Sequence, residues 1–228
     1  MHLVMFDVDG TLVDSAGFDA ELYSQAVESE LGVTVDRGWN RYEHVTDSGI
    51  LDQIVREHGF EARRDELVDR VQRRFVARVR DYLMQNAAAV REIAGARRLV
   101  ERLLGLPGVR VAVATGGWGE TARLKLAHVG MPVARIPLAS ASDATARTAI
   151  MRLAEQRAMQ GSRPIRATYF GDGPWDQRAS AELGYAFVAV GCSVSHRVAY
   201  DDLSDIDGIF AHLAGAGADA REPRLTRP

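Results

Sequence analysis

The chain has 228 residues, a formal net charge of −3 at pH 7 and 46% hydrophobic residues. This length and composition suffice for one full domain core and a smaller insertion, which excludes wholesale disorder. The slight acidic excess provides no positive field for nucleic acid, and no stretch approaches the ~20 apolar residues of a membrane helix. We therefore expect a globular protein with neither a nucleic-acid nor a membrane partner.

Two residue types are each represented once. Cys192 is the only cysteine, so neither an intrachain disulfide nor a multi-cysteine zinc site is possible, and we expect it to be a buried bystander. Lys125 is the only lysine, so a mechanism that requires lysine has one candidate. The first residues lack the basic start and long apolar run of a signal peptide, and a cytoplasmic location is the expectation.

The predicted elements begin with residues 2–8, a continuous apolar run typical of a strand buried on both faces of a parallel sheet. A glycine turn follows directly. From about residue 18 to 85, apolar residues recur at helical spacing instead, and no convincing strand occurs. The clearest repeat has a period of four residues and comprises Leu67, Val71, Phe75, Val79 and Leu83.

After residue 93, strand and helix patterns alternate, which predicts an α/β fold with a Rossmann-like, doubly wound parallel sheet. Domain boundaries follow from this change of pattern. They are a core of 1–14 and 93–214, an all-helical cap of 15–92 inserted after the first strand, and a disordered tail of 215–228 rich in Gly, Ala and Pro. The predicted strands are 109–114, 133–139, 166–170 and 185–190, and the predicted helices are one ending near 105, then 119–129, 146–159, 175–183 and 204–214.

Paired carboxylates follow two of the predicted strands. Asp7 and Asp9 lie in FDVDGTL, residues 6–12, and Asp172 and Asp176 lie in YFGDGPWD, residues 169–176. Ligands of parallel α/β sheets gather beyond the carboxyl ends of the strands, so the pairs are expected to meet there. Close like charges require a cation or a shared proton. Four carboxylates without histidine or cysteine favour Mg²⁺.

Two other segments have the chemistry of a phosphate site. Thr115 ends the strand 109–114, just ahead of Gly116, Gly117 and a predicted helix. A hydroxyl beside exposed backbone N–H groups can cradle phosphate. Arg147, near the start of the helix 146–159, is a cation at the same end of the sheet. It could bind phosphate oxygens and offset the acidic pairs.

These four segments, in this order, resemble the haloacid dehalogenase superfamily, and the helical insertion resembles its helical-cap subgroup, which includes phosphoglycolate phosphatase-like enzymes. The resemblance implies Mg²⁺-dependent hydrolysis of a small phosphate monoester through an aspartyl-phosphate. It implies that Asp7 is the nucleophile and that Asp9 is first the general acid and then the base. It also implies metal ligation by Asp7, Asp172 and the backbone carbonyl of Asp9, with Asp176 beside the metal. Thr115 would bind phosphate.

Two positions depart from the usual pattern of that superfamily. Arg147 stands where lysine is most common, and Gly116 stands where a small polar residue is common. Arginine can hold phosphate and backbone N–H groups can serve at Gly116, so activity is expected. Lys125 is the only other candidate for the lysine position, but it lies inside the helix after Thr115, and we expect it to be solvated.

The stretch YEHVTDSG, residues 42–49, is the one polar segment between predicted cap helices, and it resembles the loop by which helical caps reach substrate. Glu43, His44, Thr46 and Asp47 are therefore candidates for substrate specificity. The alternative is that Thr46 or Asp47 only caps the next helix. Two tryptophans close to the motifs are equally open between lining the site and packing; these are Trp118 and Trp175.

Several functions fit the same motifs. A sugar-phosphate mutase is the main alternative, because the motifs do not separate transfer from hydrolysis. A 2-haloacid dehalogenase is less favoured, since it needs neither Asp9 nor the second acidic pair. A non-catalytic binding protein on the same scaffold is a third alternative. The expected partner is a small phosphorylated metabolite, and monomer and homodimer are both open.

Overall fold

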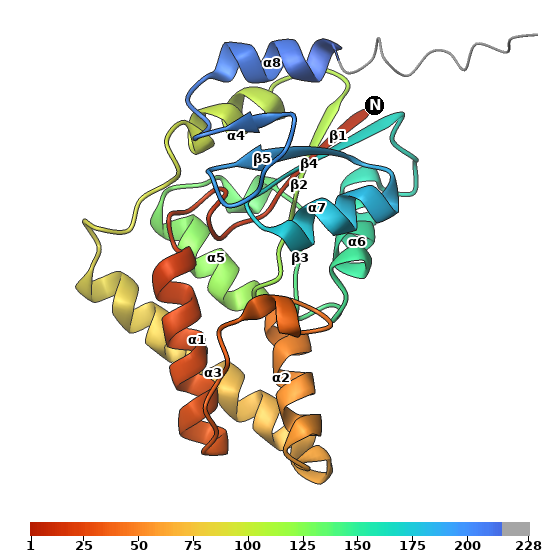
Figure 1. The fold of residues 1–228 in the computed structure, drawn as a ribbon. Helices are drawn as coiled ribbons and strands as arrows, with labels where there is room; N and C mark the ends of the chain where they lie inside the picture. The colour runs from red at the N-terminus through yellow and green to blue at the C-terminus, as the bar shows by residue number, and fades with distance from the viewer. Residues whose placement is uncertain (216–228) are drawn as a thin grey trace, which may run out of the picture.

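A six-stranded parallel sheet forms the centre of the computed structural model, which describes residues 1–215 (Figure 1). The strand order is β3-β2-β1-β4-β5-β6, so β1 lies in the interior between β2 and β4. The tail predicted to be disordered lies outside the described residues, except for residue 215. The strands are β1 His2–Phe6, β2 Val109–Ala114, β3 Leu138–Ala139, β4 Arg166–Gly171, β5 Ala186–Val190 and β6 Ala199–Tyr200.

Strand β1 is buried on both faces, as its apolar run predicted. Leu3 and Met5 point into one hydrophobic cluster, whereas Val4 and Phe6 point into the other. All four are fully buried, and burial of such a side chain contributes ~1.5–3 kcal/mol. Phe6 also stacks on Phe170 of β4, with ring centroids 4.8 Å apart. These contacts fix the register of the strands whose ends form the site.

Helices cover both faces of the sheet, which makes it doubly wound (Figure 1). Ile150 of α6 and Ala179 of α7 belong to the cluster on one face. Leu99 of α4, Ala122 of α5 and Ile209 of α8 belong to the cluster on the other. The predicted α/β Rossmann-like class is therefore confirmed. The helices are α4 Ala96–Leu104, α5 Gly119–His128, α6 Arg147–Met159, α7 Pro174–Leu183 and α8 Ile206–Gly215.

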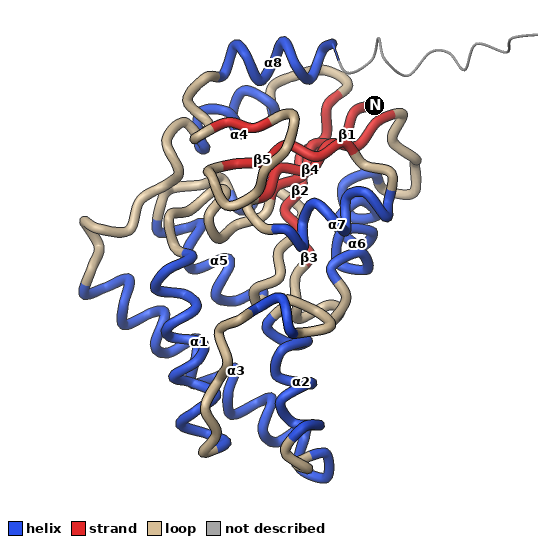
Figure 2. Tube along the Cα trace, viewed as in Figure 1, coloured by secondary structure: helices blue, strands red, loops and turns tan. Residues whose placement is uncertain are grey.

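The inserted segment between β1 and α4 is helical and lies below the sheet half of the molecule in Figure 1. Figure 2 shows only helices and loops in this part. The five apolar residues that were predicted to recur every four positions form the buried face of α3. The helical content agrees with a cap, whose limits of 15–92 stay a prediction. The inserted helices are α1 Ala16–Leu31, α2 Asp47–Glu57 and α3 Arg64–Gln85, with short 3-10 turns η1 Trp39–Arg41 and η2 Glu61–Arg63.

Three expectations differ from the structure. The strand predicted at 133–139 is reduced to β3, because Pro132 and Pro137 lack the N–H that a strand ladder needs and a 3-10 turn, η3 Val133–Arg135, fills the space between them. The first strand ends at Phe6 rather than at residue 8. Cys192, expected to be buried, is exposed on the loop after β5.

Among residues 1–215, no helix has the length and apolar character needed to cross a membrane.

Candidate active site

The site forms where three neighbouring strands end. Asp7 directly follows β1, Thr115 follows β2, and Asp172 follows β4. The backbone N–H of Asp7 donates to the carbonyl of Phe170 at 2.9 Å, which extends the ladder by one residue and holds the Asp7 side chain at the sheet edge. Gly10 turns the chain back with φ of 77°, and a Cβ there would lie 2.2 Å from Asp172 Oδ2. Only glycine permits both that backbone conformation and that approach.

Three carboxylates form a compact acidic cluster. Asp7, Asp172 and Asp176 each offer an oxygen, and these oxygens lie within 4.8 Å of one another. Burial, reinforced by the charge of Asp7, raises the pKa of Asp172 to about 8. Burial also raises the pKa of Asp176 to about 7, against the opposing charge of Arg147. Such carboxylates are stabilised by a cation, and an all-oxygen donor set without nitrogen or sulfur fits a hard divalent ion.

Arg147 is buried at the start of α6 and faces this cluster. Its Nη1 lies 2.8 Å from Asp176 Oδ1 and 3.3 Å from Asp7 Oδ2. Its Nη2 donates to the carbonyl of Val45, in the inserted segment, at 3.1 Å. Burial opposes its charge, but Asp176 and Asp7 raise the pKa of Arg147 above its usual value. Its Nε is buried without a hydrogen-bond partner among the described residues.

Thr115 and Gly116 lie beside the guanidinium of Arg147. Thr115 is 1% exposed, and its Oγ1 accepts the N–H of Gly117 at 3.2 Å. Burial raises the pKa of Asp7, while Arg147 and the Thr115 hydroxyl act to lower it. A Cβ at Gly116 would lie 2.2 Å from Arg147 Nη2, so this position is held as glycine by the arginine above it.

The side chain of Asp9 does not belong to the acidic cluster. Its Oδ1 lies 2.5 Å from Lys125 Nζ and also accepts the hydroxyl of Ser15. Asp9 Oδ2 lies near Gly117. A Cβ on residue 117 would be 3.5 Å from this oxygen. One oxygen of Asp9 is therefore committed, and the other lies at the cavity.

Lys125 is fully buried, so the expectation of a solvated lysine is wrong. Its ammonium bridges Asp9 and Asp19 of α1, the latter at 2.7 Å. A buried ammonium requires such partners. Burial lowers the pKa of Lys125, but Asp19 and Asp9 outweigh it, so the net pKa lies above the usual value. The sequence contained two hints, because Lys125 is the only lysine in an arginine-rich chain and lies between Leu124 and Leu126.

Asp19 is a residue that the sequence did not single out. It lies in the first turn of a cap helix, where an acidic residue usually serves only the helix dipole. Burial and the charge of Asp9 raise its pKa to about 6, against the opposing charge of Lys125. Only the tertiary structure brings this carboxylate of α1 to Lys125 of α5, and no local pattern records that contact.

The loop before α2 docks the inserted helices onto the site. Thr46 Oγ1 accepts the N–H of Gly49 at 3.1 Å, as a helix cap, and donates to the carbonyl of Thr145 at 2.7 Å. Asp47 Oδ2 accepts the N–H of Trp118 at 2.7 Å. Burial raises the pKa of Asp47 well above its usual value. Thr46 therefore caps a helix and also lines the cavity, while its role in substrate specificity stays a prediction.

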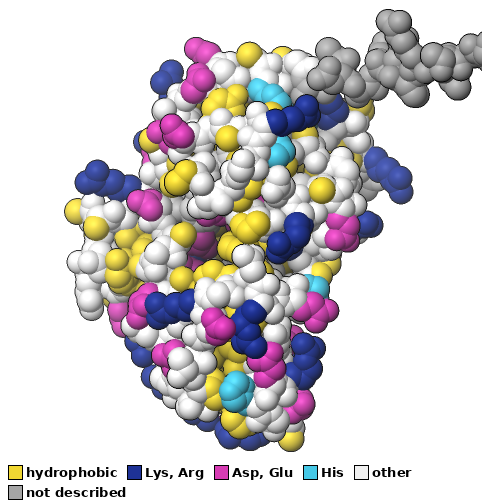
Figure 3. All heavy atoms as spheres, in the orientation of Figure 1, with side chains coloured by type: hydrophobic (Ala, Val, Ile, Leu, Met, Phe, Trp, Pro, Cys, Tyr) yellow, Lys and Arg dark blue, Asp and Glu magenta, His cyan; other side chains and the backbone are white. Residues whose placement is uncertain are grey.

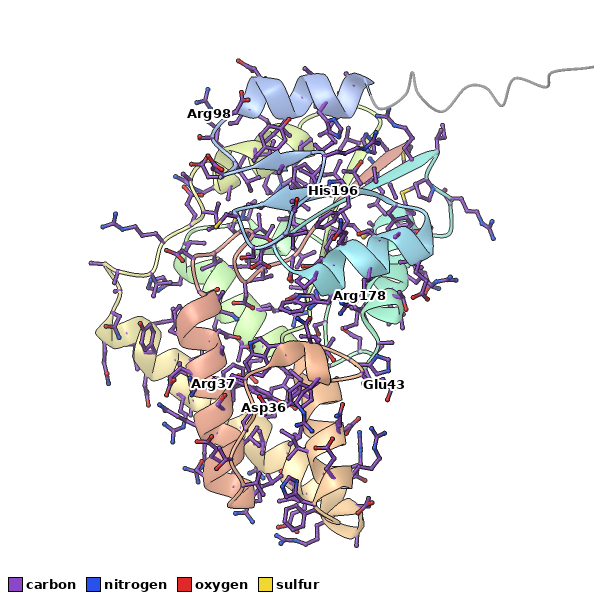
Figure 4. The ribbon with its side chains drawn as sticks, in the orientation of Figure 1. Asp36, Arg37, Glu43, Arg98, Arg178 and His196 are labelled. Carbon is purple, nitrogen blue, oxygen red and sulfur yellow. The ribbon has the colours of Figure 1, made fainter. Side chains whose placement is uncertain are left out.

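Glu43 and His44 of the same loop are not brought to the cavity. Their side chains are 68% and 38% exposed, and Figure 4 shows Glu43 on the outer edge of the loop. Asp47 faces the opposite way, toward the backbone of Trp118. Val45, Thr46 and Asp47 therefore line the cavity, whereas Glu43 and His44 face solvent.

A cavity of about 290 Å³ lies between the sheet edge and the inserted helices. On the face shown in Figure 3, hydrophobic side chains gather at the level where the two halves meet. Trp175 lines the cavity, whereas Trp118 packs beneath it against Tyr23 and Phe75, with ring centroids 5.8 and 5.9 Å away. Besides the residues already described, the lining comprises Ala16, Ala20, Tyr23, Trp39, Val45, Ile50 and Gly117.

A doubly wound sheet with polar side chains at its strand ends places this protein in the class of Rossmann-like α/β proteins that bind ligands at that edge. Residues 1–184 match the family model described as haloacid dehalogenase-like hydrolase. The chain belongs to this family of haloacid dehalogenase-like hydrolases, as the motifs of its sequence predicted.

Solved structures share the fold at low sequence identity. A hydrolase from Pseudomonas syringae is 19% identical, with a TM-score of 0.71 over 93% of this chain and 99% of that one. A β-phosphoglucomutase from Clostridium difficile is 13% identical, with a TM-score of 0.72 over 96% and 99%. A predicted phosphoglycolate phosphatase from Haemophilus somnus is 19% identical, with a TM-score of 0.61 over 91% and 97%. No curated protein sequence matches the chain significantly.

Proposed function

We propose that the protein is a Mg²⁺-dependent phosphatase that hydrolyses a small phosphate monoester through an aspartyl-phosphate on Asp7. One observation supports this most directly. Asp7, Thr115 and Arg147 line one cavity, and Asp7 also belongs to the three-carboxylate cluster. A nucleophile, donors for phosphate oxygens and a cation site are the components that phosphoryl transfer requires.

The residues for the metal are those of the acidic cluster. Asp7 and Asp172 would hold Mg²⁺ together with the backbone carbonyl of Asp9, and Asp176 would complete its surroundings. The pKa values of Asp172 and Asp176 are raised because burial and neighbouring carboxylates destabilise their ionised forms, and a bound cation would stabilise those forms. When bound, the ion offsets the repulsion between Asp7 and the phosphate and stabilises charge on the transferring group.

In the first step, an oxygen of Asp7 attacks phosphorus and the bond from phosphorus to the leaving alcohol breaks. The Asp9 carboxyl gives its proton to the leaving oxygen. Oδ2 suits this role, because Oδ1 is already engaged by Lys125 and Ser15. The Arg147 guanidinium and the Thr115 hydroxyl donate to the equatorial phosphate oxygens, where charge is concentrated.

In the second step, a water molecule attacks the aspartyl-phosphate. The Asp9 carboxylate takes its proton, the bond between phosphorus and Asp7 breaks, and inorganic phosphate leaves. Asp7 is again a carboxylate and Asp9 again carries a proton, so the cycle closes. The two roles of Asp9 differ only in the direction in which the proton moves.

A sugar-phosphate mutase is the alternative, because structures of this fold include β-phosphoglucomutases as well as predicted phosphoglycolate phosphatases. A mutase would return an isomerised sugar phosphate without free phosphate. A dehalogenase is less favoured, since it has no use for Asp9 or for the second acidic pair.

The test is phosphate release from a panel of small monoesters, with Mg²⁺ and with a chelator. We expect release that the chelator abolishes. Asp7→Asn should lose turnover by at least ~10³-fold, because the amide is a poor nucleophile, with an unchanged circular dichroism spectrum. An Asp7→Asn variant that keeps full activity would exclude the proposed nucleophile, and release that is indifferent to chelator would exclude the metal.

A further inference from the structure

The side of the cavity opposite the acidic cluster shows what leaving alcohol the site can accept. The inserted segment contributes two carboxylates there, Asp19 and Asp47. Its other contributions are Thr46 and apolar or aromatic side chains, including Tyr23 and Trp39. Among the residues that line the cavity, none from the inserted segment is Arg, Lys or His.

The two cations near the cavity are already committed. Lys125 is fully buried and is bound on both sides by Asp9 and Asp19. Arg147 is bound by Asp7 and Asp176 and by the Val45 carbonyl. Its guanidinium lies against Asp7 and Asp176, at the end of the cavity proposed for the phosphate. A second anionic group on the substrate would therefore meet no cationic partner at the far end of the cavity.

The overall charge of the site points the same way. Six carboxylates lie in or directly against the cavity and face only two cations. A divalent ion at the acidic cluster and a phosphate dianion would offset each other, so the excess of acidic groups over cations would remain. In a site of low polarity, uncompensated like charges repel strongly. The carboxylates are Asp7, Asp9, Asp19, Asp47, Asp172 and Asp176.

The arginines of the inserted helices do not change this balance. Arg37 pairs with Glu21 at 2.6 Å, and Arg70 pairs with Glu30 at 2.6 Å; the two arginine side chains are 47% and 42% exposed. Figure 4 shows Arg37 on the loop after α1, and Figure 3 shows basic and acidic side chains interspersed over the lower half of the molecule. Arg37 and Arg70 therefore form ion pairs with glutamates and do not line the cavity.

On the basis of the proposed phosphatase function, we propose that the enzyme selects monoesters whose leaving alcohol bears no second anionic group. The alcohol is neutral or cationic, with carbon surface that packs on Tyr23 and Trp39. Asp19 determines this specificity by repelling carboxylates and second phosphates, and Asp47 offers them no cationic partner. Phosphoglycolate-type esters and bisphosphorylated sugars are accordingly poor substrates, which also weighs against a mutase that passes through a bisphosphate.

Three two-carbon esters of similar size test the inference, because they differ mainly in the charge of the terminal group. These are phosphoglycolate, which is anionic, 2-hydroxyethyl phosphate, which is neutral, and phosphoethanolamine, which is cationic. With Mg²⁺ present, we expect kcat/KM for phosphoglycolate to lie at least ~10-fold below the other two, equivalent to 1.4 kcal/mol or more. Equal or preferential use of phosphoglycolate overturns the inference.

Para-nitrophenyl phosphate separates this inference from the proposed function. Its hydrolysis reports the phosphatase alone, and the three esters are ranked as competitors against it, so a ranking exists even when their own turnover is slow. Hydrolysis of the reporter with phosphoglycolate as the strongest competitor refutes the specificity and leaves the phosphatase standing. No hydrolysis of any ester refutes the phosphatase, and the inference falls with it.

Asp19→Asn and Asp47→Asn test the residues. Each keeps a hydrogen-bonding side chain and removes one carboxyl group. Asp19→Asn should raise the ratio of phosphoglycolate to 2-hydroxyethyl phosphate turnover several-fold, mainly through KM, and Asp47→Asn should raise it less. A merely structural role would lower all three esters alike and leave the ratio unchanged. Asp36→Asn is the matched control, since Asp36 is 61% exposed on the inserted segment (Figure 4), and its ratio should stay at the wild-type value.

Discussion

Gly116 and Arg147 depart from the usual family pattern together, and the structure gives one reason for both. A guanidinium is larger than an ammonium, and Nη2 of Arg147 occupies the space where a side chain at Gly116 would begin. The same Nη2 donates to the Val45 carbonyl, which anchors the arginine between sheet and inserted helices. The glycine therefore makes room for the guanidinium of Arg147.

This dependence predicts a compensating pair of substitutions. Gly116→Ala should lower kcat/KM at least ~10-fold, because a misplaced catalytic side chain costs that much or more. Arg147→Lys removes Nη2, so Gly116→Ala should cost distinctly less in the Arg147→Lys background than in the wild type. The measurement is a double-mutant cycle on kcat/KM. Independent, additive costs would show that Arg147 does not determine the residue at 116.

The burial of Lys125 predicts that its substitution lowers the free energy of unfolding substantially. Lys125→Met keeps much of the volume but leaves Asp9 and Asp19 as buried carboxylates without a counterion. Removing one partner of a buried pair destabilises by ~3–5 kcal/mol. Urea unfolding should show this loss, and adding Asp19→Asn to Lys125→Met should recover part of it. A loss below ~1 kcal/mol would mean that the ammonium contributes little in solution.

Individual residues differ in how far the sequence could predict them. Asp7, Thr115 and Asp172 were placed at one edge because each follows a recognisable strand, and parallel strands end together. Lys125 was placed in solvent because lysine is almost never fully buried unless it is paired. Its partner Asp19 lies 106 positions away in the chain, so the pairing depends on tertiary packing that no local pattern encodes.

At the scale of elements, the start of α2 joins the inserted helices to the sheet half. The N–H of Asp47 donates to the Gly116 carbonyl at 2.8 Å, and the Asp47 side chain accepts the N–H of Trp118. Thr46 adds its bond to the Thr145 carbonyl. Three loops of the site are thus connected through the first turn of one helix, and a change there affects docking as well as helix stability.

Thr46→Val should show both effects. The valine is nearly isosteric but can neither cap Gly49 nor donate to Thr145, and loss of an N-cap alone costs ~0.5–2 kcal/mol. We expect a loss of ~1–3 kcal/mol in urea unfolding, accompanied by a raised KM because the cavity wall loosens. Thr46→Ser keeps the hydroxyl and serves as the control. Equal stability of the Val and Ser variants would assign no role to the hydroxyl.

The elements that the sequence predicted well are those with long, regular patterns. β1, β2, β4 and β5 have five or six residues, of which the last four are buried in each strand. The buried face of α3 repeats every four residues. β3 and β6 have two residues each, which is too short for any periodicity to register. Such edge strands exist because a neighbour offers free backbone groups, and this condition is set by the assembled sheet rather than by the segment itself.

At the scale of the whole molecule, the inserted helices share a hydrophobic cluster with one face of the sheet. Phe75 of α3 and Val27 of α1 belong to the same buried cluster as Val4 and Val113 of the sheet. Unfolding of the two parts is therefore expected to be coupled. The number of subunits and the cytoplasmic location stay predictions, since both depend on contacts beyond one chain.

The acidic cluster makes the stability of the whole molecule depend on pH and on Mg²⁺. The folded-state pKa of Asp172 is about 8, whereas an unfolded aspartate has a pKa of ~3.9. Between these values the folded state holds a proton that the unfolded state lacks, so the free energy of unfolding falls as pH rises. His2, whose pKa is lowered to about 4, is neutral in both states above pH ~6.5 and does not oppose this trend.

Thermal unfolding with a chelator should therefore show a midpoint that falls between pH ~6.5 and ~8.5. Asp172 alone accounts for ~2 kcal/mol over this window, which corresponds to ~5 °C for a domain of this size. Mg²⁺ binds the ionised carboxylates, so saturating Mg²⁺ should flatten the fall and raise the midpoint most at the alkaline end. Asp172→Asn, which cannot titrate at this position, should flatten the fall without Mg²⁺. Wild-type curves with and without Mg²⁺ that run parallel across the window would show that the cluster does not bind the ion.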